Sequence, residues 1–284
     1  MNTQSLLLVG AALTVLSGCQ MPSAQTQQPS AVAKQGDVRI VLAADLDWQA
    51  LNPARGAASP RAGTLWGDRG GAAATGFLAR FSEGFSSPAH IHNVTYRAVV
   101  IEGEIHNDDP GAASQWMGPG SFWTQPAGES HITAARGRAN LALVEIDHGP
   151  YLVHPPKQAF DHEERPINVD VSNLVWLPAT RDRRVGDGAD IAHLWRRFDG
   201  QSSSGSFLRL PPGFHGRLTT DGDVFHAVVI RGQLEHAEGA GDVLAPGSYF
   251  GAEGPSVQFL SASETSGATV YIRSNGNYRV APAG

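Results

Sequence analysis

The second half of this 284-residue chain repeats the first half at a nearly constant spacing. Leu65-Trp66 returns as Leu194-Trp195, and Ala98-Val-Val-Ile-Glu-Gly103 returns as Ala227-Val-Val-Ile-Arg-Gly232, both 129 residues later. Further pairs share this offset or lie within two residues of it: Gly76/Gly205, Arg80/Arg209, Gly84/Gly213 and Pro119-Gly-Ser-Phe122/Pro246-Gly-Ser-Tyr249. So many matches in one register indicate an internal duplication, and the chain therefore folds as two copies of one structural unit.

Each copy consists of short β-prone runs separated by Gly and Pro, and no long 3.6-residue apolar stripe follows residue 35. This pattern predicts an all-β protein built as a sandwich or a barrel. The predicted strands are 77–81, 95–101, 121–124 and 141–146 in the first copy and 206–210, 224–230, 248–250 and 269–272 in the second.

His90-Ile91-His92 is the motif with the clearest chemistry. Side chains alternate faces along a strand, so the two histidines point the same way, about 6.6 Å apart, and can bind one metal ion. A third histidine, His131, follows the run Gly120-Ser-Phe-Trp-Thr-Gln-Pro126-Ala-Gly128. Neutral imidazole suits Zn²⁺, Fe²⁺, Cu²⁺ and Ni²⁺.

Together with Gly84 and Gly103, these residues resemble the two motifs of the cupin superfamily. The resemblance implies two tandem double-stranded β-helix (jelly-roll) barrels, each with an internal pocket, and a metal held by His90, His92 and His131. This chain departs from the family at Tyr96, which stands where the family places a glutamate ligand. All-histidine cupins that cleave β-diketones with iron and O₂ show that a site without that glutamate can be catalytic.

The second copy has lost the imidazoles. At the repeat spacing, His90 matches Thr219, His92 matches Asp221, His131 matches Gln258, and Tyr96 matches Phe225. We therefore expect one divalent transition metal per chain, in the first barrel, with Fe²⁺ or Zn²⁺ favoured over Mn²⁺, Ni²⁺ and Cu²⁺. Residues kept in both copies are expected to serve the fold, with Trp66/Trp195 in the core and Arg80/Arg209 in ion pairs.

Three protein ligands leave coordination positions open, which is typical of a catalytic metal site. Without the glutamate the metal keeps its full charge, which favours an anionic or enolate-like ligand. We expect Tyr96 to stay uncoordinated and to donate a hydrogen bond to that ligand, because a phenol with a pKa near 10 becomes a tyrosinate ligand only with strong metal assistance. Glu129 shares a face with His131 if the strand is regular, and is either a fourth ligand or general base or a solvated carboxylate at the rim.

Other aromatic and histidine side chains have weaker signals. Trp116 and Trp123 either line the pocket mouth or fill the core. We expect surface or loop positions for four histidines that lie outside the motif: His106, His148, His154 and His162. His226, in the second copy, should face away from the second pocket.

The N-terminus resembles a lipoprotein signal peptide, because the apolar segment 6–15 is too short to span a bilayer and ends in Leu16-Ser17-Gly18-Cys19. Cys19, the only cysteine, would be lipidated; an ordinary signal peptide is the alternative. The following residues are rich in Gln, Ser, Pro and Ala and read as a disordered tether. Gln20 after the cysteine implies transport to the outer membrane, with the protein facing the periplasm.

These features divide the chain into a signal peptide (1–19), a tether (20–37), a metal-binding barrel (38–158) and a degenerate barrel (159–284). A net charge of −6 without a basic patch argues against nucleic acid as a partner. The expected partners are a small-molecule ligand and the membrane, the latter through the lipid anchor only; a homodimer is left open.

The region after residue 40 also resembles a family of two-barrel cupins of unknown function, and more remotely the zinc-binding cupin domain of bacterial anti-sigma factors. The first resemblance rests on Trp48 and the segments 51–56, 64–69 and 90–96. The leading functional hypothesis is a metal-dependent oxygenase or isomerase that acts on a small oxygenated organic molecule. The alternative is a non-catalytic periplasmic ligand-binding or metal- and redox-sensing cupin.

Overall fold

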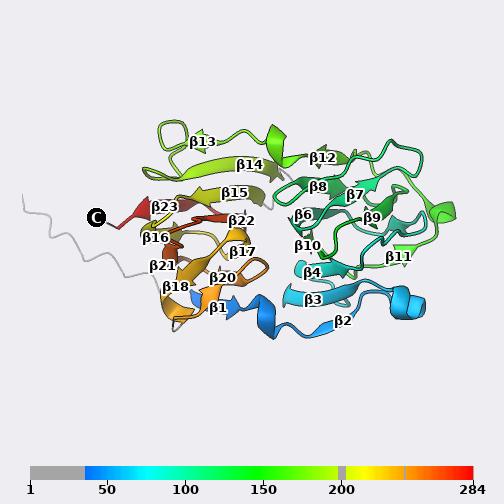
Figure 1. Ribbon diagram of the computed structural model, residues 1–284, viewed down its shortest axis with the longest axis horizontal. Helices are drawn as coiled ribbons and strands as arrows, with labels where there is room; N and C mark the ends of the chain where they lie inside the picture. The colour runs from blue at the N-terminus through cyan, green and yellow to red at the C-terminus, as the bar shows by residue number, and fades with distance from the viewer. Residues whose placement is uncertain (1–35, 198–202, 240, 284) are drawn as a thin grey trace, which may run out of the picture. The chain divides into compact units, whose positions relative to one another are not determined.

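The structure, a computed structural model, describes residues 36–197, 203–239 and 241–283 (Figure 1). Cys19 and most of the expected tether lie outside these residues. Within the described ranges no helix is long and apolar enough to cross a membrane. The helices are short 3-10 segments: η1 (Ala43–Asp45), η2 (Pro53–Ala58), η3 (Pro156–Gln158), η4 (Val171–Asn173) and η5 (Ala237–Gly239).

The first barrel contains an antiparallel seven-stranded sheet in the order β12-β8-β6-β10-β4-β3-β2. Its opposite wall is broken into two short pairs, β5 with β11 and β7 with β9. The strands are β2 (Trp48–Ala50), β3 (Arg61–Trp66), β4 (Thr75–Phe81), β5 (Ile91–His92), β6 (Tyr96–Glu102), β7 (Ile105–Asp108), β8 (Phe122–Gln125), β9 (Ile132–Ala135), β10 (Asn140–Ile146), β11 (Val153–His154) and β12 (Ile167–Val169).

The second barrel has a matching seven-stranded sheet, β1-β20-β17-β22-β15-β14-β13, and a continuous five-stranded wall, β19-β18-β21-β16-β23. The strands are β1 (Asp37–Val41), β13 (Leu177–Pro178), β14 (Asp190–Arg196), β15 (Ser204–Leu210), β16 (His215–Thr220), β17 (Val224–Gly232), β18 (Leu234–His236), β19 (Val243–Leu244), β20 (Tyr249–Glu253), β21 (Ser256–Ala262), β22 (Ala268–Ser274) and β23 (Tyr278–Pro282).

The predicted fold class is confirmed: the chain forms two tandem jelly-roll barrels, and each predicted strand coincides with an observed one to within a few residues. The expected domain boundaries need correction at two places. β1 pairs with β20 and so completes the sheet of the second barrel, while β12 pairs with β8 of the first (Figure 1). Each barrel therefore borrows an edge strand from beyond the boundary at residues 158 and 159, which covers an edge that would otherwise be unpaired.

The repeated Trp and Gly residues form one structural unit in each barrel. A bulge between Thr64 and Trp66 places Trp66 opposite Gly76, and a bulge between His193 and Trp195 places Trp195 opposite Gly205. A Cβ on Gly76 would lie 2.1 Å from the Trp66 ring, and one on Gly205 would lie 1.9 Å from Trp195. The indole needs a neighbour without a side chain, which explains why Trp and Gly recur together.

Both faces of each large sheet are buried. In β6, Tyr96, Ala98 and Val100 point into the first barrel, whereas Val99 and Ile101 join an apolar layer between the barrels. In β17, the corresponding layers are Phe225/Ala227/Val229 inside and Val228/Ile230 outside. The two large sheets therefore pack against each other through their outer faces.

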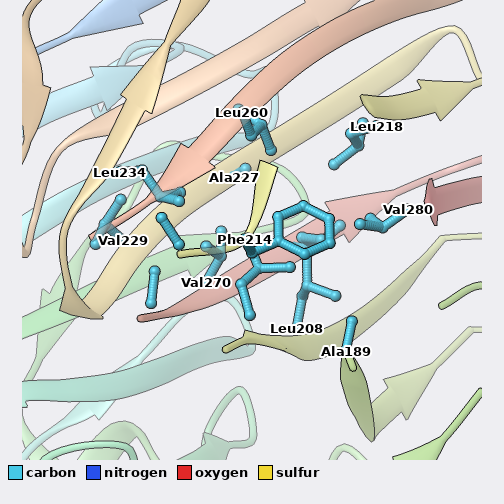
Figure 2. Close-up of a cluster of buried hydrophobic side chains, with 14 of the residues drawn as sticks. Ala189, Leu208, Phe214, Leu218, Ala227, Val229, Leu234, Leu260, Val270 and Val280 are labelled. Atoms are coloured by element: carbon cyan, nitrogen blue, oxygen red, sulfur yellow. The ribbon is translucent and has the colours of Figure 1, made fainter. Parts of the chain in front are cut away.

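The interior of the second barrel is filled with apolar side chains (Figure 2). Phe214 and Leu218 extend into it opposite Leu208 of the large sheet, and all three are buried. The second barrel therefore has an apolar core in its interior.

The repeated arginines have different roles. Arg209 forms the expected ion pair, with Asp190 at 2.5 Å. Arg80 instead stacks on Trp48, with its guanidinium carbon 3.9 Å from the ring centroid, and no ion pair of Arg80 occurs within the described ranges. The ion-pair expectation therefore holds for one of the two residues.

A buried ionic cluster lies between the barrels around Asp147. Its carboxylate accepts a hydrogen bond from Arg97 Nη1 at 2.9 Å and from Arg197 Nη1 at 2.5 Å, and Arg273 Nη1 lies 2.8 Å away. Burial alone would raise the pKa of Asp147, but the three guanidinium groups outweigh it and lower the pKa to about 2.

We predict that Asp147→Asn lowers the free energy of unfolding by about 3–5 kcal/mol, because it removes the carboxylate that Arg97, Arg197 and Arg273 share. Arg273 keeps Glu145, 3.4 Å away. Chemical denaturation at neutral pH measures this difference. Asp161→Asn, which breaks an exposed pair with Arg165, is the matched control and should have little effect.

The same variant has a defined pH dependence. Because the folded-state pKa of Asp147 lies below its ordinary value of 3.8, its contribution is complete above pH 3.8 and is lost as the pH falls from 3.8 through about 2. The stability difference between wild type and Asp147→Asn should shrink over that window. A difference independent of pH would contradict this assignment.

Candidate metal centre

The backbone brings the three predicted histidines together. His90 and His131 face each other in an antiparallel bridge, with each N–H donating to the other's carbonyl at 3.0 Å. His92 lies two residues further along β5 and therefore points to the same side as His90. This one backbone pairing thus brings into contact two histidines that lie about 40 residues apart in the sequence.

The three imidazoles form a compact cluster. The ring centroids lie 4.3 Å apart for His90–His131, 5.0 Å for His90–His92 and 5.3 Å for His92–His131. One nitrogen from each ring lies within 4.8 Å of one nitrogen from each of the others. His92 and His131 are buried and His90 is half-buried. No other such cluster of metal-ligating side chains occurs among the described residues.

Backbone carbonyls orient all three rings in the same way. Nδ1 of His90 lies 2.9 Å from Pro88 O, Nδ1 of His92 lies 3.0 Å from Leu152 O, and Nδ1 of His131 lies 3.1 Å from Glu129 O. A carbonyl can only accept, so each Nδ1 carries the hydrogen and each Nε2 keeps its lone pair. Such outer hydrogen bonds are typical of metal-binding histidines, and this donor set fits a transition metal.

The cluster is neutral at physiological pH. Burial lowers the pKa of His90 and lowers that of His92 well below 6.5, with a further contribution to His92 from the neighbouring histidines. For His131, burial and His90 lower the pKa to about 3. The imidazoles are therefore in the protonation state that metal ligation requires.

Tyr96 lies beside the cluster, but its hydroxyl group donates its hydrogen to another side chain. The hydroxyl donates to Asn107 Oδ1 at 2.8 Å, and Asn107 Nδ2 in turn donates to Gln125 Oε1 at 2.9 Å. The Tyr96 oxygen lies 3.4 Å from His131 Nε2 and can offer only a lone pair there. Burial raises the pKa of Tyr96 to about 12, in keeping with a neutral phenol. The expectation that Tyr96 donates to a ligand is therefore wrong in this structure.

Tyr151 is the hydrogen-bond donor that the sequence analysis missed. Its ring stacks on His92 with centroids 4.4 Å apart, and its hydroxyl lies 3.1 Å from His92 Nε2. Burial of the hydroxyl raises the pKa of Tyr151 well above 10, so it keeps its hydrogen. Tyr151 lies just after β10, in a stretch that the sequence marks only as the approach to a domain boundary.

Glu129 contributes through its backbone. β9 begins at Ile132, so the regular strand assumed for Glu129 does not extend to it. Its carboxylate is not part of the ligand cluster and does not line the adjacent cavity. Its carbonyl oxygen accepts from Gln125 Nε2 at 3.2 Å and also orients His131. Glu129 is therefore neither a fourth ligand nor a general base in this structure.

His90 and His92 line one side of a cavity of about 180 Å³ inside the first barrel, and the His131 ring packs against both of them. The other walls are mainly apolar and aromatic. They include Leu51, Phe77, Phe81, Phe85, Tyr96, Trp123, Val144 and Tyr151. Trp123 lines this cavity as well as filling the core, whereas Trp116 lies elsewhere, beside His106 and Arg136.

The second barrel has no equivalent cluster, although the residue matching needs a correction of one position. His90 faces His131, and in the second barrel Gln258 faces Leu218, so Leu218 and Thr220 are the counterparts of His90 and His92. Both are buried, whereas Asp221 is exposed. None of Leu218, Thr220 and Gln258 is a histidine.

The remaining histidines are placed mainly as expected. His148 and His162 are exposed, and His154 lies half-buried in β11. His226 faces away from the second barrel's interior and stacks on Trp66 at 4.4 Å. The surface expectation is wrong for His106, which is buried in β7.

The chain belongs to the family described as domain of unknown function DUF4437, whose model matches residues 39–281. No curated protein sequence matches the chain. The matched range spans both barrels, and the family description leaves the activity open.

Several solved structures share the fold. A candidate dioxygenase from Nostoc punctiforme matches with a TM-score of 0.62 and 16% identity, over 88% of this chain and 83% of its own. Oxalate decarboxylase from Lactobacillus farciminis matches with a TM-score of 0.56 and 10% identity, over 86% and 88%. Salicylate 1,2-dioxygenase from Pseudoaminobacter salicylatoxidans matches with a TM-score of 0.54 and 13% identity, over 86% and 85%. At these identities the likeness concerns the fold alone.

We predict that the purified protein holds close to one equivalent of a divalent transition metal, and that His90→Ala/His92→Ala holds almost none. Removing two of three ligands leaves too few donors to retain the ion. Elemental analysis after dialysis measures the content. His215→Ala, which removes an exposed histidine of the second barrel, is the control; equal metal loss in both variants would contradict the site.

Proposed function

We propose that this protein is a metal-dependent enzyme, an oxygenase or isomerase, that acts on a small oxygenated organic molecule bound at the three-histidine centre. The observation that carries the proposal is the orientation of three imidazoles at a mainly apolar cavity, each with its hydrogen on Nδ1 and a lone pair on Nε2. A divalent transition metal held by His90, His92 and His131 would supply Lewis acidity, and iron would add redox chemistry with O₂.

The two tyrosines beside the cluster have complementary roles in this proposal. Tyr151 has a hydrogen to donate, because among the described residues its hydroxyl contacts His92 Nε2, the nitrogen that would bind the metal. Tyr96 can only accept, because Asn107 takes its hydrogen. A polar ligand in the cavity would thus meet one donor and one acceptor, and such fixed groups orient a substrate without reorganisation.

One observation favours the non-catalytic alternative, a ligand-binding or metal- and redox-sensing module. No Asp or Glu lines the cavity among the described residues, so the site has no carboxylate to act as a general base. Metal identity distinguishes the two candidates. Iron with O₂-dependent turnover supports the enzyme, whereas tightly held zinc without turnover supports the sensor or binder.

The test is O₂ consumption by iron-loaded protein offered β-diketones and hydroxy acids as chelating probes, with isomerised products followed by chromatography. We predict turnover in wild type and a loss of about 100-fold in Tyr151→Phe, because a donor to the reacting oxygen is removed while the metal ligands remain. Metal content should be the same in both proteins.

Tyr96→Phe is the matched control for that variant. It removes a hydroxyl that only accepts near the cluster, so it should keep both the metal and most of the turnover. A greater loss in Tyr96→Phe than in Tyr151→Phe would contradict the assigned roles, and the absence of turnover with every metal would favour the binding or sensing module.

We further propose that the protein is a lipoprotein anchored through Cys19 to the periplasmic face of the outer membrane. The proposal rests on the sequence Leu16-Ser17-Gly18-Cys19 and on Gln20 after it. Cys19→Ala should abolish palmitate labelling and release the protein from sedimented membranes. Labelling that persists in this variant would exclude Cys19 as the attachment site.

A further inference from the structure

Arg55 is the one charged side chain, apart from the histidines, that lines the cavity among the described residues. Its guanidinium carbon lies 5.3 Å from the centre of the Phe85 ring, and the residue is half-buried. It is also close enough to His90 for its charge to help lower the pKa of that histidine, after the larger effect of burial. Arg55 and the metal cluster therefore face the same space.

Arg55 has no anionic partner in the part of the chain that the structure describes. Arg97, Arg136 and Arg209 each have a carboxylate oxygen within 2.9 Å. No such oxygen lies near the Arg55 guanidinium, whose five N–H groups are strong donors. The charge at the cavity is thus unpaired.

The turn that carries Arg55 is held in place by its own hydrogen bonds. Leu51 N donates to Pro60 O at 2.8 Å, and Asn52 N donates to Ser59 Oγ at 2.9 Å, which closes the segment at both ends. Gly56 has φ +55° and ψ −130°, a conformation that L side chains rarely adopt. The segment Leu51-Asn52-Pro53-Ala54-Arg55-Gly56 therefore forms a defined turn that holds Arg55 at the cavity, a role separate from metal binding.

The cavity lacks negative charge from any source. Its histidines can be neutral or positive but not negative, and its other lining residues apart from Arg55 are of uncharged types. No Asp or Glu is found among the lining residues. With a metal dication in place, the apolar walls would enclose two positive centres, and a charge in such surroundings is costly unless it is paired.

We infer that the ligand of this cavity is a small organic carboxylate with an apolar body. Its carboxylate binds Arg55, and its apolar part contacts Phe77, Phe81 and Val144 on the way to the histidine cluster. Arginine suits this role because its planar fork matches a carboxylate with two parallel hydrogen bonds. The volume of about 180 Å³ is below the roughly 300–1,000 Å³ of pockets for drug-sized ligands, so the ligand is small. This inference names the substrate class of the proposed function and rests on it.

The test measures binding to zinc-loaded protein, so that turnover does not interfere. Benzoate and benzamide have the same shape and differ in charge, and isothermal titration gives the affinity of each. Benzoate should bind wild type about tenfold or more tightly than benzamide, and Arg55→Gln should lose most of that preference, with the zinc dication responsible for the remainder. Arg55→Lys should restore part of it, because lysine keeps the charge but loses the fork.

Arg80→Gln is the matched control. Arg80 also stacks on an aromatic ring, that of Trp48, but it does not line the cavity, so this variant should behave as wild type. Metal content and thermal unfolding of each variant verify that the site and the fold are intact.

The outcomes separate this inference from the proposed function. If zinc binds but benzoate shows no preference over benzamide, or Arg55→Gln leaves that preference undiminished, the carboxylate inference is overturned and the metal centre stands. If neither zinc nor iron binds, the proposed function is overturned, and the titration is made on metal-free protein. There, Arg55-dependent binding of benzoate still supports the carboxylate site, and its absence overturns it.

Discussion

The face-to-face packing of the two seven-stranded sheets is the interaction on which the rest of the structure depends. Each sheet has one face inside its own barrel and one in the shared layer, where Val99 and Ile101 of β6 meet Val228 and Ile230 of β17. A sheet buried on both faces cannot be separated from its partner without exposing a large apolar surface. The second barrel is thus needed by the first for its packing.

The contrast between the two barrels shows what the cavity requires. In the second barrel, β16 and β21 pair over six residues and the interior is filled with side chains such as Phe214. In the first barrel the same wall is reduced to short pairs and isolated bridges, among them Ser86–Ala134 and His90–His131. Carbonyls at Pro88, Leu152 and Glu129 that would otherwise be available to a ladder orient the imidazoles instead. Proteins commonly depart from regular strand pairing at functional sites, where the lost backbone hydrogen bonds lower stability but allow the site to form.

The sequence predicts the fold and the three histidines because both depend on local patterns, the repeat spacing and the alternation of faces along a strand. It does not predict the direction of a hydrogen bond: only the position of Asn107 shows that Tyr96 accepts and does not donate. Tyr151 reaches His92 through a return of the chain 59 residues later, which no motif marks. The one-residue error at Thr219 and Asp221 arose because a constant offset ignores shifts between the copies, while the pairing of Leu218 with Gln258 fixes the true register. The exchange of β1 and β12 is likewise a long-range pairing.

The interface between the barrels has the pattern of a twofold-symmetric dimer within one chain. Arg97 of the first barrel stacks on Trp195 of the second at 3.9 Å, and His226, its counterpart, stacks on Trp66 at 4.4 Å. In such an interface the same surface serves both partners, so two identical barrels would have to satisfy it with identical residues. When the copies are joined in one chain, their interface residues no longer have to be identical. Arg97 of the first barrel pairs with Asp147, whereas the second barrel has the uncharged Asn275 at the position that matches Asp147. The same freedom allows one barrel to keep three histidines and a cavity while the other fills its interior and provides the surface against which the first is stabilised.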